Sequence, residues 1–174
     1  TNTACVDATL DGNPDNDCDG DTVTVDDLVA VIEVVCANNA AALSYNVLTS
    51  ASLADQPITL TWKPNGATAS TSPTQVLRTL ESGDEGTIAW PGLLFVGDIP
   101  IDYPGWRQLA EGDYNADGTV KAGLVTYNGL VLDSHEVDYA WRDGSTVTVS
   151  VNPTLTFQVA YPPESPTCDA PHPT

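Results

Sequence analysis

The chain has 174 residues, 41% of them hydrophobic, and carries 24 acidic against 5 basic side chains, a formal net charge of −19 at pH 7. A chain of this length can bury about two-thirds of its unfolded surface, so we expect one main domain with a core of its own. The negative charge argues against nucleic acid and anionic lipid as partners, since both would repel it. No apolar run approaches the roughly 20 residues of a membrane-spanning helix, so we expect no membrane span.

Residues 1–40 are expected to form an acidic loop followed by one α-helix, packed on the main domain. From Thr24 onward, apolar residues fall at the spacing i, i+3, i+4 and i+7 of one helical face, namely Leu28, Val31, Ile32 and Val35. Thr24 suits the N-cap position. The sequence Ala-Asn-Asn at 37–39 would end the helix.

Residues 41–163 predict strands instead. Segments such as LSYNVLTSA, PITLTWKP and TLTFQVAYP are rich in Val, Ile, Thr and aromatic residues, and turn-forming Pro, Gly, Asn and Asp separate them. The segment TVTVSVNPTLTFQVAY predicts a hairpin that turns at Asn152–Pro153. Six or seven short strands indicate a mainly β fold, specifically a β-sandwich, with an immunoglobulin-like layout as one option. Residues 164–174 form a Pro-rich C-terminal tail.

The four cysteines are Cys5, Cys18, Cys36 and Cys168. An even number in an acidic, Lys-poor chain indicates two disulfides formed in an oxidising compartment, and hence a secreted, extracellular or cell-surface protein. Three connectivities are open. We favour Cys18–Cys36, which would tie the acidic loop to its helix, together with Cys5–Cys168, which would join the two ends.

The acidic stretch DNDCDGDTVTVDDL, starting at residue 15, has the composition of a calcium-binding loop. Calcium takes roughly six to eight oxygen ligands, which alternate residues of a tight turn can supply before a last carboxylate on the following helix. The candidate ligands are Asp15, Asp17, Asp19, Asp21 and Asp27. The register stays open: the loop starts at Asp15 with one extra residue, or at Asp17 without the glycine, and a strict twelve-residue count ends on Asp26.

A second stretch, GDYNADGTV at 112–120, offers oxygen ligands in the same order, from Asp113, Asn115, Asp117 and Thr119. Asp133 could complete the shell, because Leu124 occupies the position of the last ligand. The alternative is an Asp/Asn/Gly turn that binds nothing.

Both stretches resemble the calcium-binding repeat of bacterial dockerins, an EF-hand-type loop. The resemblance implies one or two Ca²⁺ ions and secretion; it does not carry over cohesin binding, because strands separate the two stretches.

No catalytic motif stands out, and we expect no enzymatic activity. His135 and Glu136 are adjacent, but a second histidine one helical turn away is missing, so this is no zinc-protease motif. The four tryptophans could form a sugar-stacking platform or belong to the core; they are Trp62, Trp90, Trp106 and Trp141.

The sequence therefore favours a secreted, calcium-binding structural or adhesive protein that acts through its surfaces. Thr- and Val-rich strands offer edges for strand addition, so self-association into an extracellular filament or surface assembly, or binding to another extracellular protein, is the expected mode. The alternative is a carbohydrate-binding or accessory module of a secreted hydrolase. Exposed tryptophans in a row on one sheet face would favour that alternative.

Overall fold

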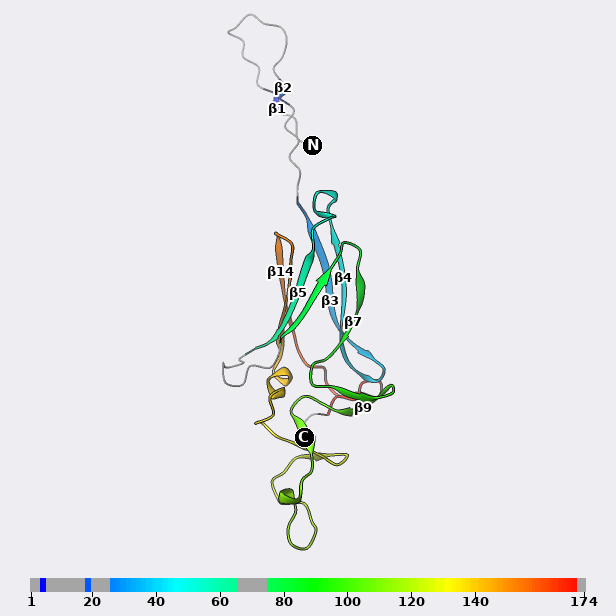
Figure 1. Ribbon diagram of the computed structural model, residues 1–174, viewed down its shortest axis with the longest axis vertical. Coiled ribbons are helices and arrows are strands. Elements are labelled where there is room, and N and C mark those ends of the chain that lie inside the picture. Colours follow the sequence, from blue (N-terminus) through cyan, green and yellow to red (C-terminus); the bar gives the residue numbers. More distant parts are fainter. Residues whose placement is uncertain (1–3, 6–17, 20–25, 66–74, 172–174) are drawn as a thin grey trace, which may run out of the picture.

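The computed structural model describes residues 26–65 and 75–171, and the backbone of residues 4–5 and 18–19 (Figure 1). The described chain is built from strands, with short 3₁₀ turns at Ala51–Leu53, Glu111–Asp113 and Tyr139–Arg142. The prediction of a mainly β fold is confirmed. Nowhere in the described ranges is there a helix long and apolar enough to cross a membrane.

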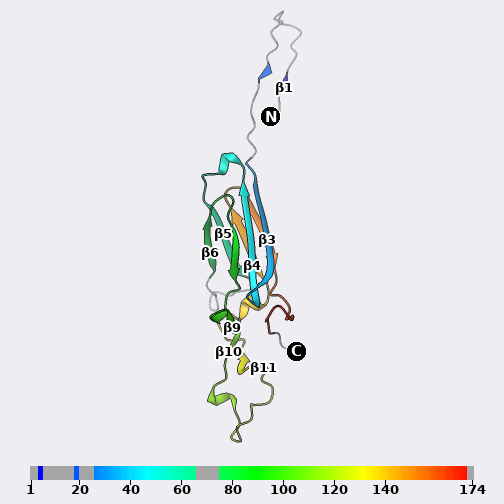
Figure 2. The same ribbon diagram turned by 90° about the vertical axis from the view of Figure 1, so that its right-hand side faces the viewer.

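Two sheets form the body of the molecule and share one core. The first has the strand order β14-β13-β5-β6 and the second the order β3-β4-β7. Figure 2 shows β5 and β6 in one layer and β3 and β4 in the other. The bounds are β3 Leu28–Ala37, β4 Ala40–Thr49, β5 Ile58–Pro64, β6 Val76–Leu80, β7 Glu85–Ala89, β13 Ser145–Ser150 and β14 Thr154–Val159. We refer to these strands as the two-sheet body.

Tryptophans fill the centre of the two-sheet body. The ring of Trp62 meets those of Trp90 and Trp141 edge-on, at centroid distances of 4.9 and 5.2 Å. Trp62 Nε1 donates to Ser145 Oγ at 2.6 Å, and Trp90 Nε1 donates to the Trp141 carbonyl at 3.0 Å. A buried indole N–H usually has such a partner. These tryptophans are therefore core residues, the second of the two alternatives that the sequence left open.

The predicted helix at the N-terminal side is wrong: the same residues form the strand β3. It pairs with β4 over ten residues, from Leu28↔Thr49 to Ala37↔Ala40. The expected helix stop at 37–39 is a two-residue hairpin turn, in which Asn38 and Asn39 have φ angles of 52° and 60°, as a type I′ turn requires. The hairpin crosses the boundary expected after residue 40.

The physical reason for this error lies in the composition of β3. Its sequence LVAVIEVVCA is apolar at nearly every position, so it satisfies the helical spacing and the alternation of a strand equally well. The even-numbered residues Ala30, Ile32 and Val34 pack against the core. β-branched residues dominate the segment, and these favour a strand. The predicted hairpin at Asn152–Pro153 is confirmed, because β13 and β14 pair on either side of it.

Residues 91–142 form an end lobe below the two-sheet body in Figure 1. It contains the hairpin β8 (Leu94–Val96) and β9 (Ile99–Asp102), and a three-stranded sheet in the order β10-β12-β11. The strands of that sheet are β10 Trp106–Gln108, β11 Thr126–Tyr127 and β12 Leu130–Leu132. Tyr103, Trp106 and Leu130 form its small core.

The favoured disulfide pairing is also wrong, because Cys36 is bonded to Cys168. Cys36 lies near the end of β3, and the C-terminal segment passes that end as a parallel bridge between Ala40 and Asp169. Cys5 is the register partner of Cys18 in the short pair β1 (Ala4–Cys5) and β2 (Cys18–Asp19). The tail therefore docks on the body, and we call residues 165–171 the strap.

Candidate functional site

The first predicted calcium site lies mainly outside the described residues. Asp15, Asp17 and Asp21 fall there, and Asp19 is described only as backbone of β2. Asp27 is exposed and lies in extended chain just before β3, where its N–H donates to Ser50 Oγ at 3.2 Å. The helix turn that would have presented Asp27 to an ion is absent. Calcium binding at this stretch stays a prediction.

The second predicted site contains an arginine that the sequence analysis did not consider. Arg107 donates to both carboxylate oxygens of Asp113, at 2.7 and 3.1 Å, and through Nε to Asp133 at 2.8 Å. The N–H of Ala110 adds a third donor to Asp113, at 2.8 Å. Hydrogen bonds from Arg107 lower the pKa of Asp113 to about 2 and also lower the pKa of Asp133. The guanidinium thus occupies the two carboxylates that an ion would need.

The other predicted ligands of this loop form a closed turn. Asn115 N–H donates to the Thr119 carbonyl at 2.7 Å, and its side-chain amide donates to Thr119 Oγ1 at 3.0 Å. Asp117 Oδ1 accepts both the N–H and the hydroxyl of Thr119, at 3.0 and 2.6 Å. No group of three His, Cys, Asp or Glu side chains suited to a metal occurs within the part of the chain that the structure describes. Calcium binding here would require Arg107 to release Asp113.

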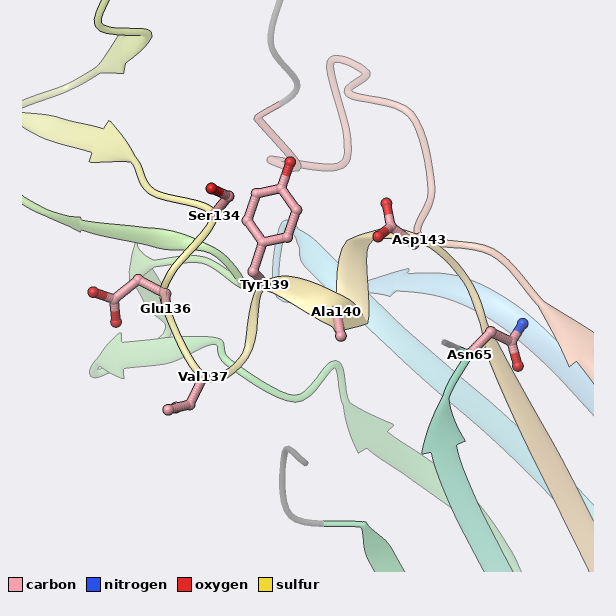
Figure 3. A pocket seen from close by; sticks show the side chains of 7 residues that line it. All are labelled: Asn65, Ser134, Glu136, Val137, Tyr139, Ala140 and Asp143. Carbon is pink, nitrogen blue, oxygen red and sulfur yellow. The ribbon is translucent and has the colours of Figure 1, made fainter. Parts of the chain in front are cut away.

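A pocket of about 340 Å³ opens beside the 3₁₀ turn Tyr139–Arg142 (Figure 3). Its two carboxylates, Glu136 and Asp143, leave the backbone in different directions, and the hydroxyl of Tyr139 points away from Glu136. Its lining residues are Asn65, Ser134, Glu136, Val137, Tyr139, Ala140 and Asp143. Catalysis by a carboxylate pair needs both groups aimed at one substrate bond, and this pocket does not supply that arrangement.

Two half-buried carboxylates of the end lobe accept hydrogen bonds from backbone N–H groups. Asp138 Oδ1 accepts the N–H of Gly105 at 2.9 Å, and Asp102 Oδ1 accepts the N–H of Tyr103 at 2.9 Å. Burial raises the pKa of both side chains, and the charge of Glu136 raises that of Asp102 further. Each carboxylate fixes a turn of the end lobe. Their position explains the raised pKa values without a catalytic role.

The tryptophan row that would favour carbohydrate binding is absent. All four tryptophans are buried, and Trp106, the only one in the end lobe core, is 2% exposed. Since sugar-binding platforms depend on exposed aromatic faces, the alternative of a carbohydrate-binding module loses its main support.

The outer face of the first sheet is unusual for so acidic a chain, because it carries no Asp or Glu. Alternate residues of its strands enter the core, so the residues between them face outward. Central rows are made of hydroxyls, such as Thr156, Thr148 and Thr61, which are cross-strand partners. We call this surface the threonine face; it consists of Thr59, Thr61, Lys63, Leu77, Thr79, Thr146, Thr148, Ser150, Thr154, Thr156 and Gln158.

On one side of the two-sheet body, both sheets end in strands that are almost free of charge. The edge strands β3 and β14 contact each other, and Glu33 is their only charged residue. No other strand of the described chain pairs with the open side of either one. On the opposite side, the edge strands β6 and β7 carry Arg78 and Glu85. We call the β3–β14 side the uncharged edge.

The register of β3 identifies which backbone groups are open. Residues that close a two-residue hairpin are hydrogen-bonded to each other, and bonded and non-bonded pairs then alternate along the ladder. Counting from Ala37↔Ala40, the N–H and C=O groups of Ala30, Ile32 and Val34 point away from β4. Beside them Val29 and Val31 keep 57% and 51% of their surfaces exposed. A long apolar strand with open hydrogen-bonding groups is a template for another strand.

The sequence predicted that Thr- and Val-rich strands would offer edges for strand addition, but it did not predict that β3 would be such an edge strand. The alternation of Thr with Val or Leu in TVTVS and TLTFQ was available as a signal for the threonine face. The position of β3 at an edge depends on sheet order, which no local pattern shows.

A scan against protein-family models gave no match, and searches of curated proteins and of solved structures gave none either.

Proposed function

We propose that the chain is a secreted structural or adhesive module, a β-sandwich that associates with further copies of itself through the uncharged edge. One observation carries the proposal: in a chain with a net charge of −19, the two edge strands of one side hold a single charged residue, Glu33. The disulfide between Cys36 and Cys168 agrees with an oxidising, extracellular location.

Electrostatics favours this side for contact between identical copies. Like charges about 6 Å apart repel by roughly 0.7 kcal/mol per pair in water, and by more where water is excluded. Contacts through most other surfaces would add many such pairs. A contact through β3 adds few, while its open N–H and C=O groups supply hydrogen bonds to a partner strand.

The strand β3 also fits a symmetric partner. In an antiparallel pair with a two-fold axis at Ile32, Ala30 would face Val34 of the second copy, so that outward-pointing backbone groups meet each other. Glu33 would then face Val31 instead of a second Glu33. Such an interface uses the same patch on both copies, which is the commonest symmetry of soluble dimers.

Calcium remains part of the proposal. One or two ions bound by the acidic stretches would reduce the net charge and with it the repulsion between copies. The proposed ligands are the same as above: Asp15, Asp17, Asp19, Asp21 and Asp27 for one ion, and Asp113, Asn115, Asp117 and Thr119 for the other.

The experiment is sedimentation velocity of the full chain at about 10 to 300 μM, a range set by the micromolar affinities of modest interfaces, with two matched variants. Val31→Glu adds a charge on the uncharged edge, and Leu77→Glu adds the same charge on β6 at an almost identical exposure, 53% against 51%. We expect the wild type and Leu77→Glu to associate alike and Val31→Glu to stay monomeric. A monomeric wild type, or equal association of both variants, contradicts the proposal.

A further inference from the structure

The bond between Cys36 and Cys168 joins two points that are 132 residues apart in the sequence. We infer that it acts as a tension bypass: a pull between the chain before β3 and the chain after Cys168 travels along β3 and across the disulfide. The residues between the two cysteines, which build most of the two-sheet body and the whole end lobe, are left outside the loaded path.

The loaded path can lengthen very little. It consists of the strand Leu28–Cys36 and one covalent bridge, whose Cα atoms are 5.3 Å apart. A β-strand already rises about 3.3 Å per residue, whereas a fully stretched chain reaches at most about 3.6 Å. Force along this path therefore meets a segment that is nearly straight before any load is applied, and the folded body does not have to unfold.

Noncovalent contacts place the strap where the bridge needs it. Asp169 N–H donates to the Asn39 carbonyl at 2.7 Å, and Arg142 donates to the Pro171 carbonyl at 2.9 Å. Cys168 and Ala170 are buried. The strap is thus docked through residues 168–171, while residues 165–167 are exposed, and these contacts are expected to hold it on the body when the disulfide is open.

The bypass has a switch, because Cys36 is an exposed residue whereas Cys168 is buried. An external dithiol can attack the disulfide through its thiolate; it is oxidised to its own disulfide, and Cys36 and Cys168 become two thiols. After this two-electron exchange, the same pull loads every strand between the cysteines. The protein changes from an inextensible link into one that lengthens by unfolding.

The inference concerns load along one chain and does not depend on which partner binds the uncharged edge. Its test is single-molecule force spectroscopy of the full chain, held at its two termini. Without reductant, we expect no length to be released from the residues between the cysteines. With about 10 mM dithiothreitol, a concentration well above typical protein thiols, unfolding should release roughly 440 to 475 Å more, since 132 residues each extend by about 3.3 to 3.6 Å.

A double variant, Cys36→Ser with Cys168→Ser, should release this length with and without reductant. Should it fail to fold, adding dithiothreitol to a single held wild-type molecule gives the same comparison. Cys5 and Cys18 are close in sequence, so opening any bond between them would change the length by about a tenth of that amount. Release of the full length from the oxidised wild type, or no added length after reduction, overturns the inference.

Discussion

The hydroxyl of Tyr127 donates a hydrogen bond of 2.6 Å to Oδ1 of Asp169, and this bond joins the end lobe to the strap. The other oxygen of Asp169 accepts the hydroxyl of Tyr103, so one carboxylate holds two tyrosines of the lobe. Because the backbone N–H of Asp169 is bonded to Asn39 of the β3–β4 turn, a single residue connects the strap, the two-sheet body and the end lobe.

Replacing Asp169 with Asn should loosen this junction. The amide removes the charge from both hydrogen bonds, and losses of this kind cost about 1 to 3 kcal/mol of unfolding free energy. Urea unfolding followed by tyrosine fluorescence measures the change. Tyr127→Phe, which removes one of the two bonds, should cost less. An Asp169→Asn variant as stable as the wild type would contradict this role.

The same pair predicts a pH effect in the alkaline range. The hydrogen bond to Asp169 is the main cause that raises the pKa of Tyr127 to about 12, from 10. A raised pKa means that the folded state holds its proton longer, so the contribution to stability is complete below about pH 10 and is lost as the pH rises through about 12. Tyrosinate absorbance should show one tyrosine fewer titrating near pH 12 in Tyr127→Phe, and an earlier titration of Tyr127 in Asp169→Asn. Identical titration of Asp169→Asn and the wild type would count against the bond.

The disulfide should contribute more stability than any other single feature. Closing a loop of 132 residues restricts the unfolded chain by up to about 5 kcal/mol in the chain-entropy account. We therefore expect the variant Cys36→Ser with Cys168→Ser to lose several kcal/mol in urea unfolding, and to lose more than a Cys5→Ser variant with Cys18→Ser, because the same account gives that much shorter loop at most about 3 kcal/mol. The reverse order would show that the long loop is not closed in solution.

Arg107 provides a test of calcium binding at the second loop. Arg107→Gln frees Asp113 from its ion pair, so the pKa of Asp113 should rise from about 2 towards its ordinary value of 3.8. If the loop binds calcium, the variant should bind it about tenfold more tightly than the wild type, which is about 1.4 kcal/mol for one competing charge pair removed. Isothermal titration calorimetry measures this affinity, with Asp113→Asn and Asp117→Asn together as the variant that cannot bind. Equal heats from Arg107→Gln and the double variant would exclude calcium at this loop.

Salt should strengthen self-association. Raising the salt concentration from about 0.01 to 0.15 M shortens the screening length from about 30 to about 8 Å, which weakens the repulsion between two chains of charge −19. The hydrogen bonds and apolar contacts of the uncharged edge are short-ranged and keep their strength. We expect the dissociation constant to fall by about tenfold, as measured by sedimentation equilibrium. Weaker association at higher salt would indicate an interface held by ion pairs.

The strands after residue 41 were predictable because their information is local. Thr alternating with Val or Leu marks a half-buried strand, and Asn152–Pro153 marks a turn. The strand β3 was not predictable in this way. A segment that is apolar at almost every position fits both the helical spacing and the alternation of a strand, and only its pairing with β4 decides between the two. The two Asn residues at 38 and 39 carried the missing signal: positive φ angles at both suit a hairpin turn.

The disulfide and the Arg107 ion pairs are set by the tertiary structure, although Cys36 and Cys168 are 132 residues apart and Arg107 and Asp113 only 6. Cys36 and Cys168 meet because the strap runs back to the β3–β4 turn, which follows from the whole topology. In the same way, the spacing of Asp113, Asn115 and Asp117 fits a calcium loop, and only the fold brings Arg107 against Asp113. Local spacing predicts the candidate ligands, but only the tertiary structure shows that the Arg107 guanidinium competes with an ion for Asp113.

The most direct measurement of the central claim is amide hydrogen exchange along β3 at low and high protein concentration, resolved by residue. In the monomer the N–H groups of Ala30, Ile32 and Val34 point away from β4, whereas those of Val31 and Glu33 are bonded to β4. We predict that the first three become protected as the protein associates, while the last two are slow at every concentration. Association without any slowing at Ala30, Ile32 and Val34 would contradict the claim that copies meet through the open side of β3.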